Sequence, residues 1–399
     1  MSLVLTAVGI VLLVEVILSH ELLRRALGTA PRPPALAAYP SVSVIRPIRG
    51  LDPGLEENLA TAFNQDYPGR VETIFVLDDE HEPALPAVRA AIAAHPQARA
   101  HVVLCGPPPA DRTGKLNAMI LGLRLSRGEL VAFVDSDIRP DPTTLRTVVE
   151  TLLGAPGAGA AFTEVYVPGP TRTVGDAGYA LLLNGMYDPA AAAAARRRGG
   201  DLPFIMGQFM VLTRAALRAI GGLESAAGEL VDDMALGLRL AAAGYRNMIA
   251  AHPVPVIQER LPLREFLAIY NRWLTFGRTG LPGLSFKSIN WLHGLVFWLG
   301  ALGAVVAAAA GWPLATALCA AAPVAVTASI TRLHHLMGGR LSARHLWAAA
   351  GLLLVAPVVL ARVLVQREVT WRGRSYRLDG RARLAATPAA PAARSSAPA

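Results

Sequence analysis

The first hydrophobic segment of the chain is residues 3–18, which are almost wholly apolar except for Glu15. With its flanks, this segment reaches the roughly 20 residues that span a bilayer. No small-residue cleavage site follows it, and Arg24 and Arg25 come next. We therefore predict an uncleaved transmembrane anchor at residues 1–22, with the following domain in the cytoplasm by the positive-inside rule. A cleaved signal peptide is the alternative interpretation.

The pattern changes between residues 41 and 251, after a proline-rich stretch at residues 30–40 that we interpret as a stiff linker. Short β-type runs alternate there with amphipathic stretches, which predicts an α/β domain with a mainly parallel sheet and helices on both faces. In such sheets, ligands bind beyond the carboxyl ends of the strands. The predicted strands are 41–48, 71–79, 100–105 and 129–137, and the predicted helices are 56–63, 83–95 and 115–126.

The last third of the chain holds three long apolar runs, at residues 290–311, 313–331 and 345–364. Their lengths predict three further membrane spans within residues 289–365, although buried core helices are an alternative. We expect the remaining residues, 366–399, to form a basic and then disordered tail. Three later spans would place this tail opposite the cytoplasmic domain, yet both it and the loop at residues 332–344 are basic. Either one run is re-entrant or the charge rule fails, and the sequence leaves both possibilities open.

Composition agrees with a multi-pass protein of the inner or plasma membrane. The chain is 53% hydrophobic and 17% charged, which is too apolar for an ordinary soluble enzyme. Its net charge of +9 comes from arginines that crowd beside the apolar segments, which favours a membrane surface over nucleic acid as the partner. No zinc-finger spacing or aromatic-rich RNA signature is present. The two cysteines, Cys105 and Cys319, lie far apart in the sequence and predict neither a disulfide framework nor a cysteine metal site.

Two apolar strands end in acids, at Asp78-Asp79 and at Asp135-Ser136-Asp137. Burying an unpaired carboxylate is costly, so these side chains must meet water, a cation or a hydrogen-bond donor. An Asp-x-Asp motif suits a hard divalent cation that also binds diphosphate oxygens, and the first pair could hold nucleoside hydroxyls. Either pair alone could be only a turn or a helix cap. Their position at successive strand ends favours a shared site.

Two further patterns allow both a structural and a chemical interpretation. Asp232 and Asp233 begin a predicted helix, where carboxylates favour the helix dipole, but an Asp could also act there as a general base. Arg272 and Trp273 lie on an amphipathic stretch before the apolar runs. They could form an interfacial belt. Alternatively, Arg272 could bind a leaving diphosphate while Trp273 lines an acceptor site.

Taken together, these segments resemble a known family. The motifs are SVIRPIRGLDPGLEENL, NQDYP, VLDDEHEPA, RTGKLNAM, VDSDIRPDP, GQFMVLTRAAL, LVDDMALGLRLAAAGYR and NRW, in that order, across about residues 40–280. The chain resembles the processive and lipid-directed glycosyltransferases of the family 2 type, in particular the ceramide glucosyltransferase branch of sphingolipid metabolism. The resemblance implies a GT-A nucleotide-diphospho-sugar transferase domain, a UDP-sugar donor such as UDP-glucose, Mg or Mn, and a membrane lipid acceptor.

The resemblance also implies roles for particular residues. It implies that Asp78 or Asp79 holds the nucleoside, that Asp135 and Asp137 bind the metal, and that Asp233 is the general base, preceded by Asp232. The Arg-Trp pair matches Arg272 and Trp273. Donor-site and acceptor-side positions match Lys115 and Asn117, and Gly207 and Gln208, respectively.

Two departures from the family pattern limit what carries over. The family usually has Gln or Arg three residues before the Arg of Arg-Trp, and this chain has Ile269 there, which weakens the case for processive synthesis. The first acid motif is one residue longer than in the ceramide branch, so a related hopanoid-glycosylating branch is an alternative. Transfer to a polyprenyl phosphate, and a membrane scaffold without catalysis, are the rival hypotheses.

Overall fold

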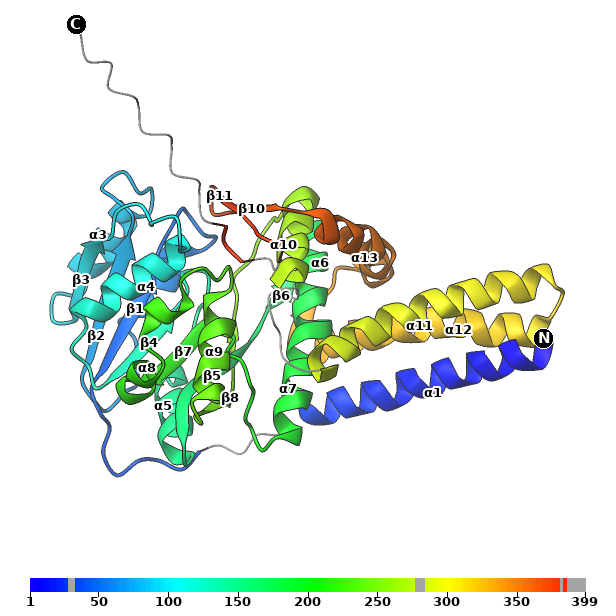
Figure 1. Ribbon diagram of the computed structural model, residues 1–399, viewed down its shortest axis with the longest axis horizontal. Coiled ribbons are helices and arrows are strands. Elements are labelled where there is room, and N and C mark those ends of the chain that lie inside the picture. Colours follow the sequence, from blue (N-terminus) through cyan, green and yellow to red (C-terminus); the bar gives the residue numbers. More distant parts are fainter. Residues whose placement is uncertain (28–32, 277–283, 381–382, 386–399) are drawn as a thin grey trace, which may run out of the picture.

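The computed structural model describes residues 1–27, 33–276, 284–380 and 383–385 of the chain. It divides into an α/β domain and a set of long apolar helices that project from it (Figure 1). Residues 28–32 of the predicted linker, and residues 386–399 of the predicted tail, lie outside the described residues.

A seven-stranded sheet forms the centre of the α/β domain, in the order β3-β2-β1-β4-β7-β5-β8. Neighbouring strands are parallel except for β7, which runs antiparallel to both β4 and β5. The predicted mainly parallel sheet is therefore confirmed. Its strands are β1 (Val42–Pro47), β2 (Val71–Leu77), β3 (Arg99–Leu104), β4 (Leu130–Val134), β5 (Ala158–Tyr166), β7 (Phe209–Thr213) and β8 (Arg246–Pro255).

Helices cover both faces of this sheet because both faces of its central strands are apolar. In β4, Ala132 and Val134 pack into one buried cluster, whereas Val131 and Phe133 pack into another on the opposite face. Such strands read as continuous apolar runs rather than as alternating ones. The helices of the domain are α2 (Leu55–Ala60), α3 (Leu85–Ala93), α4 (Gly114–Leu125), α5 (Thr144–Gly154), α6 (Val174–Leu182), α7 (Asp188–Arg197), α8 (Arg214–Ala219), α9 (Asp232–Ala242) and α10 (Leu263–Phe276).

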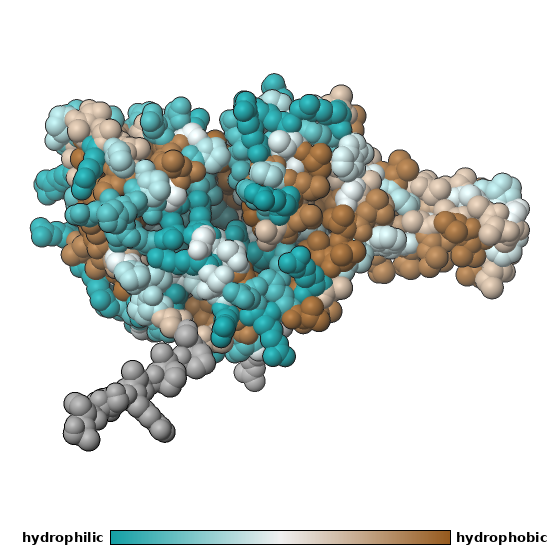
Figure 2. Space-filling view, turned by 90° about the horizontal axis from the view of Figure 1, so that it is seen from above, coloured by the Kyte–Doolittle hydropathy of each residue, from teal (hydrophilic) through white to brown (hydrophobic). Residues whose placement is uncertain are grey.

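Four helices in the described residues are long and apolar enough to cross a membrane. They correspond to the predicted N-terminal anchor and the three C-terminal runs: α1 (Ser2–Ala26), α11 (Leu284–Ala309), α12 (Pro313–Leu336) and α13 (Ala348–Val365). Helices α1, α11 and α12 pack together into a bundle that extends away from the sheet, whereas α13 packs beside α10 and α6 (Figure 1). The bundle surface is hydrophobic where the α/β domain is largely hydrophilic (Figure 2).

Residues 366–380, the first part of the stretch that we expect to form a basic and then disordered tail, have a defined structure after α13. Residues 368–377 form a β-hairpin of β10 (Glu368–Trp371) and β11 (Arg374–Arg377). Val369 and Leu378 pack against Leu230 and Val231, just before α9. The first part of this stretch is therefore basic but folded, because its few apolar side chains meet a partner surface on the domain.

Candidate active site

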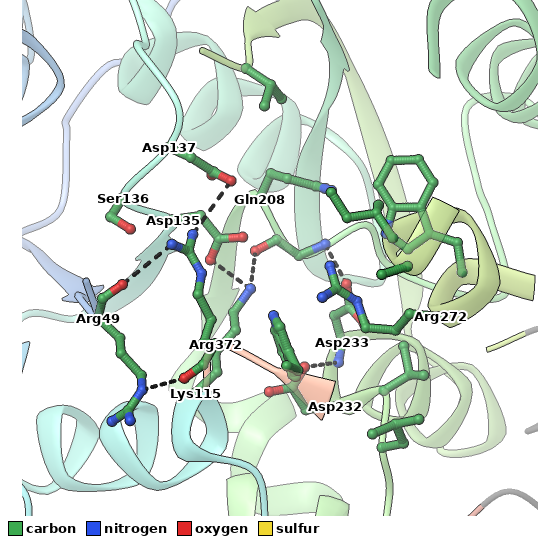
Figure 3. A pocket seen from close by; sticks show the side chains of 18 of the residues that line it. Arg49, Lys115, Asp135, Ser136, Asp137, Gln208, Asp232, Asp233, Arg272 and Arg372 are labelled. Atoms are coloured by element: carbon green, nitrogen blue, oxygen red, sulfur yellow. Dashed lines mark hydrogen bonds and ion pairs between the residues drawn. The ribbon is translucent and has the colours of Figure 1, made fainter. Parts of the chain in front are cut away.

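The acids that follow β4 lie at the carboxyl edge of the sheet, as predicted. The backbone N–H of Asp135 donates to the carbonyl of Gln208 (2.9 Å), and the N–H of Ile257 donates to the carbonyl of Asp137 (2.7 Å). The first bond continues the pairing of β4 with β7, and the second joins the segment after β4 to the segment after β8, so the backbone of both aspartates is held in place. Asp135 and Asp137 line one cavity together with Ser136 and Asp233 (Figure 3). Asp78 lines the same cavity.

A buried arginine lies next to these acids and donates a hydrogen bond to the backbone of Asp135. Arg46, in β1, is 1% exposed and donates to the carbonyls of Asn58 (2.8 Å) and Asp135 (3.1 Å). Burial lowers its pKa to about 10, against the opposing effect of nearby Asp135 and Asp137. It remains a cation at neutral pH and offsets part of the negative charge of the motif.

The structure separates the two acids that end β2. Asp78 is 8% exposed, lines the cavity and pairs with Arg49 and with Arg374 (2.9 Å). Asp79 is exposed, and its carboxylate accepts from the backbone N–H of His81 (2.8 Å) as a local turn acid. Of these two acids, Asp78 lines the cavity and Asp79 does not.

Asp233 faces the same cavity from the first turn of α9 (Figure 3). Its carboxylate accepts from the N–H groups of Gly207 (2.6 Å) and Met234 (2.8 Å). A Cβ on Gly207 would lie 2.6 Å from this carboxylate, so the close approach requires glycine. Burial, followed by the neighbouring charge of Asp232, raises the pKa of Asp233 to about 7. A carboxyl group with this pKa is suited to proton transfer near neutral pH.

Lys115, at the start of α4, links the two groups of acids. Its Nζ lies 2.5 Å from a carboxylate oxygen of Asp135 and donates to the carbonyl of Gly207 (3.2 Å). Burial alone would lower the pKa of Lys115, but Asp135, Asp232 and Asp233 together raise it. The side chain therefore stays cationic. Asn117 does not share this position, because its amide group is oriented toward the carbonyl of Cys105 (3.5 Å) and does not line the cavity.

The Arg-Trp pair on α10 lies on the opposite wall of the cavity. The guanidinium of Arg272 lies 5.3 Å from the ring centroid of Trp371 in the hairpin, a cation–π arrangement. Burial lowers the pKa of Arg272 to about 10. Trp273 packs against Tyr179 (5.3 Å between ring centroids) and Tyr187 (5.6 Å), and all three rings line the cavity.

The hairpin supplies cations that the sequence analysis missed. Arg372 pairs with Asp52 and lies 3.8 Å from Asp137, and Arg374 pairs with Asp78. Asp52 in turn accepts from the hydroxyl of Ser136 (2.5 Å). The available signal was the alternation of Arg with Trp and Tyr in residues 371–377, which differs from a simple solvated charge run.

The cavity that these groups share has a volume of about 970 Å³ and two chemically different ends. One end carries the acids and the cations Arg49, Lys115, Arg372 and Arg374. The other end is apolar and is lined by Ala268, Ile269, Leu274, Trp291, Leu360, Val363 and Leu364 of α10, α11 and α13. A polar nucleotide and an apolar chain could therefore occupy one continuous space.

The residues at the acidic end fit a divalent cation whose remaining coordination positions are filled by a substrate. Oδ1 of Asp137 is buried without a hydrogen-bond partner, and crowding with Asp135 and Asp52 adds to burial in raising the pKa of Asp137 to about 6. A cation would relieve this crowding. Among the described residues no group of three His, Cys, Asp or Glu side chains could hold a metal unaided. Mg²⁺ commonly takes one or two carboxylates and fills its remaining positions with water and substrate phosphates.

This sheet, with its acids at the carboxyl edge, defines a glycosyltransferase of the GT-A type. The chain belongs to glycosyl transferase family 21, whose sequence profile matches residues 3–384. The structure is similar to that of a mannosyltransferase from Pyrobaculum calidifontis in complex with GDP-Man and Mn²⁺. The TM-score is 0.55 at 25% identity, over 88% of this chain and 99% of that one.

Parts of the chain are also similar to ceramide glucosyltransferases. Ceramide glucosyltransferase 1 of Caenorhabditis elegans is 25% identical over 260 residues, which cover 61% of this chain and 51% of that protein. A ceramide glucosyltransferase of Gibberella zeae is 28% identical over 174 residues, covering 39% of this chain and 32% of that one. The chain thus spans about half or less of the length of these relatives.

Proposed function

We propose that this protein transfers a sugar, glucose in the first instance, from a UDP-sugar to the hydroxyl group of a ceramide-like membrane lipid, with inversion. The observation that carries the proposal is the single cavity with an acidic, arginine-lined end and an apolar end. The family and its ceramide glucosyltransferase relatives support the same reaction class. The sugar, the lipid and the cytoplasmic position of the domain are all parts of the proposal.

The acidic end suits a nucleoside diphosphate. Asp78 would hold the nucleoside, and Arg372 and Lys115 would contact the diphosphate with charge-assisted hydrogen bonds. Asp135 and Asp137 would hold Mg²⁺ or Mn²⁺, which would neutralise charge on the departing diphosphate. Arg272, across the cavity, would add a second guanidinium on the leaving-group side.

Asp233 would act as the general base. Its two backbone hydrogen bonds fix the carboxylate, while the raised pKa of about 7 makes it an effective proton acceptor. A lipid hydroxyl beside Asp233 would lose its proton as its oxygen attacks the anomeric carbon, and the bond to the diphosphate would break in the same displacement. Holding both reactants in this geometry supplies much of the acceleration.

The apolar end suits the chains of a lipid acceptor. Leu360 and Leu364 of α13, Trp291 of α11 and Trp273 of α10 line it, and Trp291 and Leu364 are exposed rather than buried. A lipid could therefore bring its headgroup to Asp233 while its chains remain among these helices. Ile269 keeps this wall apolar where the family usually carries a polar residue.

The test uses purified full-length protein in detergent with a panel of UDP-sugars and GDP-Man, Mn²⁺ or Mg²⁺, and a ceramide, a hopanoid and a polyprenyl phosphate as acceptors. Mass spectrometry of the lipid product should identify a hexosylceramide formed from UDP-glucose. A product only on the polyprenyl phosphate would contradict the hydroxyl-acceptor proposal, and Asp233→Asn should then be mild because that acceptor is already anionic. Absence of nucleotide binding by calorimetry would favour the scaffold.

A further inference from the structure

Helix α13 is long and apolar enough to cross a bilayer, but both of its flanks are attached to the same α/β domain. Before the helix, Arg340 of β9 (Gly339–Arg340) pairs with Pro170 of β6 (Gly169–Pro170), in the loop that precedes α6. The guanidinium of Arg344 donates to the carbonyl of Arg172 (2.7 Å), and His345 forms a hydrogen bond with the hydroxyl of Thr171 (2.8 Å).

After the helix, the chain returns directly to the active site. Gln366 forms a hydrogen bond with Asn271 of α10, and the following hairpin places Arg374 2.9 Å from Asp78. Helix α13 has 18 residues, so its length is about 27 Å at 1.5 Å per residue. A crossing helix would place one of its ends about 30 Å away, beyond the hydrocarbon core. Both ends instead contact a domain that cannot enter the bilayer.

We infer that α13 does not cross the membrane but lies along it, embedded in the leaflet that faces the catalytic domain, while α1, α11 and α12 make the three crossings. A continuous helix cannot reverse direction, so a helix with both ends on one side must lie roughly parallel to the surface. One face of α13 packs on α10 and α6, well apart from the far end of the α1/α11/α12 bundle (Figure 1).

The opposite face of α13 is apolar and exposed, and its composition points to acyl chains as the occupant. Trp347, Leu354, Val358 and Val365 are 56%, 50%, 72% and 77% exposed. Hydrophobic surface also extends from the bundle to the edge of the α/β domain (Figure 2). Basic residues flank the helix, at Arg344 before it and Arg362 and Arg367 at its end. Such an arrangement matches acyl chains bordered by anionic headgroups.

This arrangement also resolves the charge conflict in the sequence. With three crossings, the loop at residues 332–344 and the hairpin both lie on the side of the α/β domain. The far turn between α11 and α12 is Ala310, Gly311 and Trp312, which carry no charge. All of the basic loops then share one side, which the positive-inside rule assigns to the cytoplasm. The inference concerns membrane topology and holds whatever sugar or lipid the enzyme uses.

Cysteine labelling in membrane vesicles tests the inference. In a Cys105→Ser, Cys319→Ala background, single cysteines are placed at four positions: Arg89→Cys in the domain, Ala343→Cys before α13, Ser375→Cys after it, and Trp312→Cys in the far turn. In inside-out vesicles, a membrane-impermeant maleimide should label the first three and spare Trp312→Cys, and right-side-out vesicles should give the reverse. Opposite labelling of Ala343→Cys and Ser375→Cys would overturn the inference, and so would labelling of both opposite to Arg89→Cys.

Two further measurements keep the test decisive if the cysteine-free background fails to fold. A protease site inserted after Asp379 of the otherwise native chain should be cut from the side that exposes the α/β domain. Spin-labelled amino acids that are incorporated directly at Leu346, Leu354, Val358 and Val365 of the otherwise native chain, without cysteine chemistry, should report similar depths within one leaflet by oxygen and nickel-chelate accessibility. A depth that passes through the bilayer centre along this series would show that α13 crosses.

Discussion

Arg372, at the tip of the C-terminal hairpin, lies 3.8 Å from Asp137 of the Asp-x-Asp motif and also pairs with Asp52. Three apolar helices, α11, α12 and α13, separate the two residues in the sequence, yet the hairpin places this guanidinium beside the first half of the domain. Asp52 and Asp137 outweigh burial and raise the pKa of Arg372, so it remains charged in the site. The hairpin is therefore part of the polar end of the cavity.

Replacing Arg372 by Ala should weaken donor binding. Hydrogen bonds to a charged group contribute roughly 1.5–3 kcal/mol, which corresponds to a rise of about 10- to 100-fold in the KM for the UDP-sugar. Steady-state kinetics with varied donor measures this rise, and Arg372→Lys should restore part of the affinity. Arg377→Ala is the matched control, since it removes an exposed arginine of the same hairpin that does not line the cavity. Equal effects of the two alanine variants would contradict a specific role for Arg372.

Asp137→Asn should abolish the dependence of nucleotide binding on a divalent cation. The substitution keeps the shape of the side chain but removes the charge that a hard cation requires. In calorimetric titrations, the increase in UDP affinity that Mn²⁺ causes should be at least about 100-fold smaller in the variant than in the native protein. Even outer-shell changes at metal sites cost roughly 10- to 100-fold in affinity. Asp141→Asn, at an exposed acid paired with His252, serves as the control. Unchanged Mn²⁺-dependent binding in Asp137→Asn would exclude Asp137 as a ligand.

Asp233→Asn should stop transfer while leaving donor binding intact. Loss of a general base lowers the rate by roughly 10²- to 10⁴-fold, and UDP titration should give a Kd close to that of the native protein. In the native enzyme, kcat/KM should rise with pH to a plateau above about 7, because the base must be deprotonated and its pKa is raised to about 7. The residual activity of the variant should lack this rise. Near-normal turnover in Asp233→Asn would remove it as the base.

Leu360→Trp should narrow the apolar end of the cavity without touching its polar end. The larger ring would occupy space that we assign to acceptor chains, so KM for a long-chain ceramide should increase more than KM for a short-chain analogue. Donor KM should not change. Val358→Trp is the control on the same helix, because Val358 is 72% exposed and does not line the cavity. A larger effect on the donor than on the lipid would place the acceptor elsewhere.

Glu164→Gln should stabilise the protein at alkaline pH. Burial raises the pKa of Glu164, at the end of β5, to about 7, so the folded state favours the protonated form. Stability from this group is present below its ordinary pKa of 4.5 and is lost as pH rises through about 7. The amide cannot ionise, so at pH 8 the free energy of unfolding of the variant should exceed that of the native protein by roughly 1–3 kcal/mol, and its unfolding temperature should be higher. Near pH 4 the two proteins should unfold at similar temperatures. Thermal unfolding in detergent measures this, with exposed Glu80→Gln as the control. A constant difference across pH would point to a packing effect instead.

The sequence by itself determined the first four strands of the sheet, the four apolar helices and the acids at successive strand ends. Apolar runs such as residues 130–134 are local signals, and a carboxylate directly after one must lie at the end of a strand. The helix start at Asp232 was equally local. For these features the neighbouring residues carry all of the relevant physical information.

Only the tertiary structure decided which groups meet across long separations. It placed Asp78 beside Arg374 in the cavity and left Asp79 exposed in a local turn. It turned a predicted tail into a hairpin whose arginines enter the cavity. It also placed both ends of α13 on one domain, which hydropathy cannot reveal. Each of these outcomes depends on contacts between segments far apart in the chain, and the free energy of such contacts leaves no periodic signal in either segment alone.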